Sequence, residues 1–95
     1  MTSILARGVT IPDDVLMREL DGESIILNLA SERYYGLDDV GTHMWQLLAT
    51  TSTIEEVYEI LLTEYEVEPD QLLHDMEELI EQLVEHGLLQ FTDDR

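Results

Sequence analysis

The stretch ESIILNLASERYYGLDDVGTHMW (residues 23–45) decides the fold. Its residues 24–29 alternate, so odd-numbered side chains share one face of a strand and even-numbered ones the other. A turn at 30–32 leads into a second strand at 33–37, and Asp38 is a favourable N-cap for a helix. The helical remainder of the chain must therefore pack back onto these strands.

Another strand is predicted upstream, at residues 15–20. It is joined to the strand at 24–29 by Asp21-Gly22, a two-residue link in which both positions require positive φ and which is typical of tight hairpins. Residues 1–14 form an irregular arm, with a possible edge strand at 9–11. The strands make a three-stranded antiparallel meander.

Three helices are predicted downstream. The first begins after Asp38, and the second begins at a Thr53-x-x-Glu56 capping box. The third runs from Pro69 to about His86, and Gly87 stops it. The expected apolar stripes are Val40, Met44, Leu47 and Leu48 with Trp45 on the flank, then Ile54, Val57, Ile60, Leu61 and Tyr65.

These elements predict an α+β, winged helix-turn-helix-like domain with a three-stranded antiparallel sheet followed by three helices. The domain would span residues 15–91, including a short closing strand at 88–91. Residues 92–95 would be an acidic tail. With 95 residues, the chain has room for one core.

The chain is strongly acidic, with 22 Asp and Glu residues against four arginines and a formal net charge of −18. Nucleic-acid binders need cations to displace counterions, so this charge excludes nucleic acid as a partner. The acidity has two explanations. It serves solubility or adaptation to salt, or it attracts a basic partner.

Other partners and chemistries are excluded on composition. The sequence has no cysteine, which removes disulfides, thiolate zinc sites and thiol nucleophiles. No apolar run reaches about 18 residues and no secretory signal is present, so we expect a cytoplasmic protein without membrane contact. The histidines, His43, His74 and His86, lack metal-binding spacing. The acidic pairs lack a cleft to separate their pKa values, so we expect no cofactor, no metal and no enzyme activity.

The strand at 33–37 is expected to be an exposed sheet edge, which is a standard site for the addition of an extended peptide. Parity puts Tyr34 opposite to Tyr35, so Tyr35 is assigned to the core and Tyr34 to contact with a ligand. The apolar arc of the third helix is about 140° wide, more than one packing contact needs. One flank (Leu73, Glu77, Ile80 and Val84) would wall a groove beside the strand, and the opposite flank carries Asp75 and Gln82. The sequence leaves open which flank faces the strand.

The ordered set Arg33, Tyr34-Tyr35-Gly36-Leu37-Asp38, Gly41 and Trp45, after an apolar strand, resembles the PqqD family. The resemblance covers residues 15–91 and implies a winged-helix domain that binds the leader of a ribosomally made precursor peptide. The leader would add as a strand along residues 33–37, against the third helix.

The resemblance further implies a stand-alone recognition protein of lasso-peptide pathways, which delivers the leader to a separate protease. The alternatives are a peptide chaperone in pyrroloquinoline quinone biosynthesis and a winged-helix interaction module that forms a homodimer through the same edge. Basic leader residues would be drawn by Asp70, Asp75, Glu77, Glu78 and Glu81. The candidate peptide contacts are Arg33, Tyr34, Tyr35, Gly36, Leu37, Asp70, Leu73, Asp75, Met76, Glu77 and Ile80.

Overall fold

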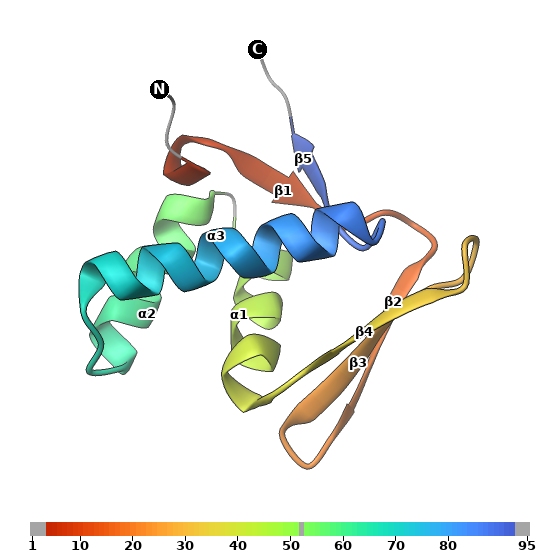
Figure 1. Ribbon diagram of the computed structural model, residues 1–95, viewed down its shortest axis with the longest axis horizontal. Helices are drawn as coiled ribbons and strands as arrows, with labels where there is room; N and C mark the ends of the chain where they lie inside the picture. The colour runs from red at the N-terminus through yellow and green to blue at the C-terminus, as the bar shows by residue number, and fades with distance from the viewer. Residues whose placement is uncertain (1–3, 52, 93–95) are drawn as a thin grey trace.

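The computed structural model describes residues 4–51 and 53–92. A 3-10 turn, η1, is followed by four strands, three helices and a closing strand (Figure 1). Their bounds are η1 Ile4–Ala6, β1 Gly8–Thr10, β2 Val15–Leu20, β3 Glu23–Asn28, β4 Arg33–Leu37, α1 Asp39–Thr50, α2 Ile54–Glu64, α3 Pro69–Glu85 and β5 Gln90–Thr92. The predicted α+β fold, with a three-stranded antiparallel sheet followed by three helices, is confirmed.

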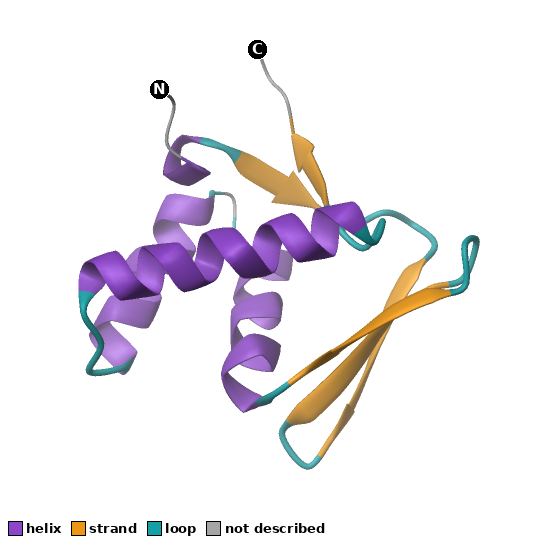
Figure 2. Cartoon of the chain, in the orientation of Figure 1, coloured by secondary structure: helices purple, strands orange, loops and turns teal. Residues whose placement is uncertain are grey.

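The larger sheet has the strand order β2-β3-β4, so β3 is central and β4 is an edge. Figure 2 shows this sheet in orange, beside the helices in purple. Asp21 and Gly22 link β2 to β3 with φ values of 56° and 85°, as the hairpin prediction requires. The β3–β4 turn is held by Asn28, whose Oδ1 accepts hydrogen bonds from the backbone N–H groups of Ala30 and Ser31. These turns fix the register, in which Ile26 lies opposite Tyr35.

The two faces of this sheet have different surroundings. The inner face carries Ile26 and Ser24, which are buried, and the helices pack on that side (Figure 1). The outer face carries Ile25 and Tyr34, which are 54% and 67% exposed. The predicted parity of the two strands is confirmed, and the even-numbered side chains of β3 are those that face the core.

The helices begin and end where their caps predict. Asp38 accepts a hydrogen bond from the Gly41 N–H at 2.8 Å, and Thr53 accepts one from the Glu56 N–H at 3.2 Å. Gly87, with φ 76°, follows the end of α3. Two assignments to the buried stripes are wrong: Val40 is 40% exposed in the first turn of α1, and Tyr65 is 37% exposed at the C-cap of α2.

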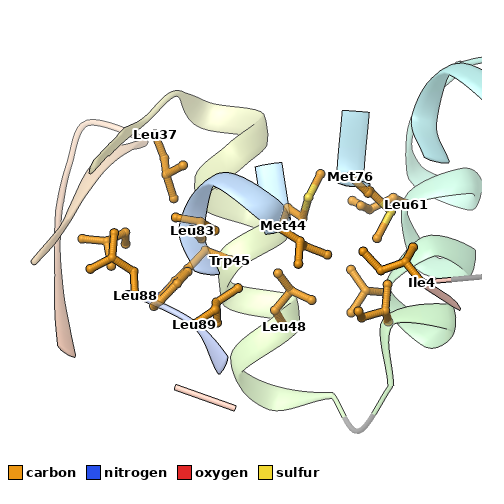
Figure 3. Packing of buried hydrophobic residues seen from close by; sticks show 14 of the residues in the cluster. Ile4, Leu37, Met44, Trp45, Leu48, Leu61, Met76, Leu83, Leu88 and Leu89 are labelled. Carbon is orange, nitrogen blue, oxygen red and sulfur yellow. The ribbon is translucent and has the colours of Figure 1, made fainter. Parts of the chain in front are cut away.

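The core lies between the helices and the inner face of the sheet. Figure 3 shows Leu37 of β4 and Ile4 of η1 in the same buried cluster as residues of α1, α2 and α3. Trp45, predicted at the flank of its stripe, is 3% exposed. A buried hydrogen bond of 2.7 Å between the hydroxyls of Ser24 and Thr42 joins β3 to α1.

A second, two-stranded sheet pairs β1 with β5 in antiparallel register. Both strands were expected, but their pairing was not predicted, because it joins segments about 80 residues apart in the sequence. The predicted N-terminal arm is thus folded onto the domain from Ile4 onward. The remainder of the arm (residues 1–3) and of the acidic tail (residues 93–95) lies outside the described residues.

Candidate functional site

β4 offers a free sheet edge. It pairs with β3 on one side, and in the part of the chain that the structure describes no strand pairs with its other side. A row of backbone N–H and C=O groups without strand partners is the structural requirement for the addition of an extended peptide.

A groove lies between β4 and α3. It consists of two adjoining hollows of about 490 and 470 Å³, which share Tyr35, Asp75 and Leu79 in their linings. The α3 side chains that line the groove are at positions 75, 78, 79, 81 and 82. Positions 75, 78, 79 and 82 follow helical spacing and therefore lie on one flank of the helix, and Glu81 lies beside them. We call this the 75–82 flank.

The two halves of the groove differ in chemistry. The half nearer α1 has mainly apolar side chains, with two acids and two glycines among them. Its lining residues are Tyr35, Gly36, Leu37, Asp38, Val40, Gly41, Met44, Asp75 and Leu79. The other half is lined by Tyr35 and Leu79 among polar and acidic side chains, namely Asp75, Glu78, Glu81 and Gln82. The groove is therefore suited to an apolar side chain at one end and a polar or cationic one at the other.

Three contacts hold the walls of the groove in place. Asn28 Nδ2 donates a hydrogen bond of 2.8 Å to the Gly87 carbonyl, which ties the end of β3 to the end of α3. The Tyr35 ring meets the His86 ring edge-on, with 5.3 Å between centroids. At the other end, a Cβ on Gly41 would lie 3.2 Å from Leu37 Cδ2, so the absence of a side chain lets α1 approach β4 closely.

The structure brings five of the predicted contacts to the groove or its edge. Tyr35, Gly36, Leu37 and Asp75 line it, although Leu37 is 6% exposed. Arg33 lies exposed at the start of β4. Tyr35, assigned to the core, is half-buried, so it both packs on the core and lines the groove.

The other predicted contacts lie elsewhere. Tyr34 projects from the outer face of the sheet, opposite to Tyr35. Met76 and Ile80 are fully buried in the hydrophobic core and do not line the groove. Leu73 and Glu77 lie on the other flank of α3 and Asp70 lies in its first turn, and none of the three lines the groove.

The sequence interpretation placed Asp75 and Gln82 on the alternative flank of the third helix, but it did not include Leu79, Val40 or Met44 among the groove residues. The available signal was the stripe i, i+3, i+4, i+7 from Asp75, which mixes polar side chains with one leucine. A search for the most apolar flank passes over such a stripe.

Other chemistry is not organised in the described residues. No group of three or more His, Asp or Glu side chains within residues 4–51 and 53–92 could hold a metal ion. His43 and His74 each contact one glutamate, Glu64 at 2.6 Å and Glu78 at 3.5 Å. Among the helices described, none has the length and apolar character needed to cross a membrane.

Comparisons with known proteins place this geometry in context. Residues 23–89 match the family described as "Coenzyme PQQ synthesis protein D (PqqD)". A comparison with curated proteins gave no match.

Two solved structures are similar along most of the chain. One, "TbiB1 in Complex with the TbiA(beta) Leader Peptide", is 30% identical with a TM-score of 0.81 and covers 90% of this chain and 99% of its own. The other, "Lasso peptide synthetase B1 complexed with the leader peptide", is 25% identical with a TM-score of 0.75 and covers 85% and 95%, respectively.

Proposed function

This chain belongs to the PqqD family, and on that premise we propose that it recognises the leader segment of a ribosomally made precursor peptide by adding the leader as a strand to β4. The observation that carries the proposal is a free sheet edge flanked by a groove against α3. The similar structures TbiB1 and lasso peptide synthetase B1 are complexes with leader peptides, which supports the same ligand class here.

The chemistry of the groove suggests what the leader carries. In an added strand, every second side chain points into the groove, and such side chains are about 6.8 Å apart. One of them would enter the apolar half beside Leu79, and the next would enter the half that contains Glu78 and Glu81. The proposed leader motif is therefore an apolar residue and a basic residue with one residue between them.

The finer biological role follows from the ligand. A domain whose described residues form a groove beside β4 would present the leader, in the cytoplasm, to a separate maturation enzyme such as a leader protease. Lasso-peptide biosynthesis is the favoured pathway, because both similar structures are leader complexes and one is named for that pathway. The description of the matching family favours a second candidate, a peptide chaperone in pyrroloquinoline quinone synthesis.

The proposal is tested with labelled N-terminal segments of candidate precursor peptides. For a segment that binds, each backbone N–H is methylated in turn, which removes one donor and leaves every side chain intact. Strand addition predicts a loss of affinity at alternate positions only, since only alternate N–H groups face β4. Each lost hydrogen bond should weaken binding roughly five- to tenfold.

Two outcomes would contradict this mechanism. One is a methylation profile without alternation, which would indicate side-chain recognition without strand pairing. The other is no binding by any segment. The identity of the peptide that binds separates the two pathways, because a lasso precursor and a quinone-cofactor precursor have different core sequences.

A further inference from the structure

The outer face of the β2-β3-β4 sheet is open and largely apolar. The three helices all lie on the inner side (Figure 1). Strand parity and register define the members of the outer face as Leu16, Arg18, Leu20, Glu23, Ile25, Leu27, Tyr34 and Gly36. Exposed apolar surface of this kind on a soluble domain indicates an interaction site.

Three of the four exposed apolar side chains of this face lie on one diagonal, and the fourth, Leu16, lies off it at 40% exposure. The rows of the sheet are Leu16–Leu27–Tyr34, then Arg18–Ile25–Gly36, then Leu20–Glu23. Leu20, Ile25 and Tyr34 therefore step across the three strands, one row per strand. They are 77%, 54% and 67% exposed, the highest values among the large apolar side chains of the strands.

The residues next to the diagonal form two complementary pairs, and the two members of each pair lie on opposite sides of the diagonal. Arg18 and Glu23 lie at equal distances on opposite sides of it, and both are exposed. Neither side chain has a hydrogen bond or ion pair to another residue within the described ranges 4–51 and 53–92. Leu27 and Gly36 form the second such pair across the diagonal.

Gly36, which lines the leader groove, also borders a hollow on the outer face of the sheet. Its φ lies outside the left-handed region, and a Cβ added there would meet nothing within 4 Å. A glycine within a strand costs about 0.5–1 kcal/mol relative to alanine, and neither backbone conformation nor internal packing requires it here. The hollow beside it has a volume of about 540 Å³ and is lined by Leu20 and Ile25, among others.

The geometry points to a second copy of this chain as the occupant of this face. A two-fold axis along the Leu20–Ile25–Tyr34 diagonal stacks each of these side chains on its own copy. The same rotation exchanges the positions beside the axis, so Arg18 meets the partner copy's glutamate at position 23. The same two-fold rotation places the leucine at position 27 of the second copy against the hollow beside Gly36. An isologous interface requires this reciprocity.

Known sheet packing permits this arrangement. With strands about 4.8 Å apart and rows about 6.8 Å apart, the diagonal makes an angle of about 35° with the strands. Strands of the two copies would then cross at about 70°, close to the orthogonal class of sheet packing. The face is only about 14 Å by about 20 Å, which is smaller than a standard interface, so the dimer is expected to be weak and reversible.

The repulsion between two copies at this contact is weaker than the net charge of the whole chain suggests. Residues 15–37 contain four acids and two arginines, a net charge of −2 out of −18. The other acids lie mostly on the helices, on the far side of the sheet from the contact. At physiological ionic strength, charges separated by more than about 8 Å are largely screened. The interface uses side chains of the outer face and not the backbone groups along the open edge of β4, although Gly36 borders both the outer hollow and the leader groove.

The test uses the proposed contact between Arg18 of one copy and the glutamate at position 23 of the other. Arg18→Glu places two acids on the face and Glu23→Arg places two arginines there. Each variant alone should therefore weaken self-association at least about tenfold, as measured by sedimentation equilibrium at up to about 1 mM chain. An equimolar mixture of the two variants should recover a dimer, because every contact across the axis then joins an acid to an arginine.

Glu59→Arg makes the same charge change as Glu23→Arg on an exposed position of α2 and should leave association unchanged. Circular dichroism shows that each variant is folded. The inference is overturned if the unaltered chain stays monomeric at about 1 mM. It is also overturned if either single variant dimerises as well as the unaltered chain, or if the mixture stays monomeric. If the chain is monomeric, the outer face of the sheet would serve to bind a different protein.

Discussion

At the scale of single residues, Leu79 is the side chain on which the proposed leader site depends most. It is half-buried and contributes to both halves of the groove, beside Tyr35 on the facing strand. An apolar anchor of the leader would bury surface against it, and a buried aliphatic side chain contributes about 1.5–3 kcal/mol.

We therefore expect Leu79→Ser to weaken leader binding by about tenfold or more. The matched control is Leu73→Ser, which makes the same change on the other flank of the same helix at a half-buried position. Fluorescence anisotropy with the labelled leader measures both affinities, and denaturant unfolding measures both stabilities. If Leu73→Ser loses more leader affinity than Leu79→Ser, the leader binds on the other flank of α3 instead, which consists of Leu73, Glu77, Ile80 and Val84.

The paired tyrosines illustrate what sequence parity can and cannot settle. Alternation separated Tyr34 from Tyr35 correctly, because side chains of a strand alternate between faces. It could not say that the face opposite the core would itself be open and apolar. The exposed tyrosine therefore belongs to the outer face of the sheet, while the half-buried one lines the groove.

At the scale of elements, one polar side chain links the end of α3 to the sheet by hydrogen bonds. Asn28 donates to the Gly87 carbonyl through Nδ2 and accepts two N–H groups of the β3–β4 turn through Oδ1. Each net hydrogen bond contributes about 0.5–1.5 kcal/mol, so the residue links three elements at modest energy.

Asn28→Ala should lower the free energy of unfolding by about 1–3 kcal/mol and also weaken leader binding, because the end of α3 is released from the sheet. Asn28→Asp keeps the acceptor for the turn and loses the donor to Gly87, so it separates the two functions. If Asn28→Asp binds the leader as well as the unaltered chain, the tie to α3 is not needed for the groove. Urea unfolding and the anisotropy assay provide the two readouts.

The sequence predicted the elements more fully than their mutual placement. Caps at Asp38, Thr53 and Gly87 are local signals, and each helix begins or ends within a residue of its prediction. The rotation of α3 about its own axis is not local. It is set by which apolar side chains reach the core, and Met76 and Ile80 are buried so completely that the mixed 75–82 flank is left to face β4.

At the scale of the whole molecule, the net charge of −18 affects two kinds of association in opposite ways. The leader motif proposed above is basic, so long-range attraction would speed its approach to the groove. Two copies of this chain repel each other at long range. The Arg18–Glu23 contacts of the proposed dimer are covered by the interface, and such contacts are screened less than exposed charges.

Raising the salt concentration from about 0.05 M to about 0.5 M should therefore slow leader association and strengthen self-association, because the Debye length falls from about 14 Å to about 4 Å. Stopped-flow anisotropy measures the first effect and sedimentation equilibrium the second. The Glu78→Gln variant should reduce the salt dependence of leader association while leaving that of the dimer unchanged, since Glu78 lines the groove and lies away from the outer face. A leader association rate that rises with salt would contradict the basic motif, and a dimer that weakens with salt would place exposed ion pairs at its interface.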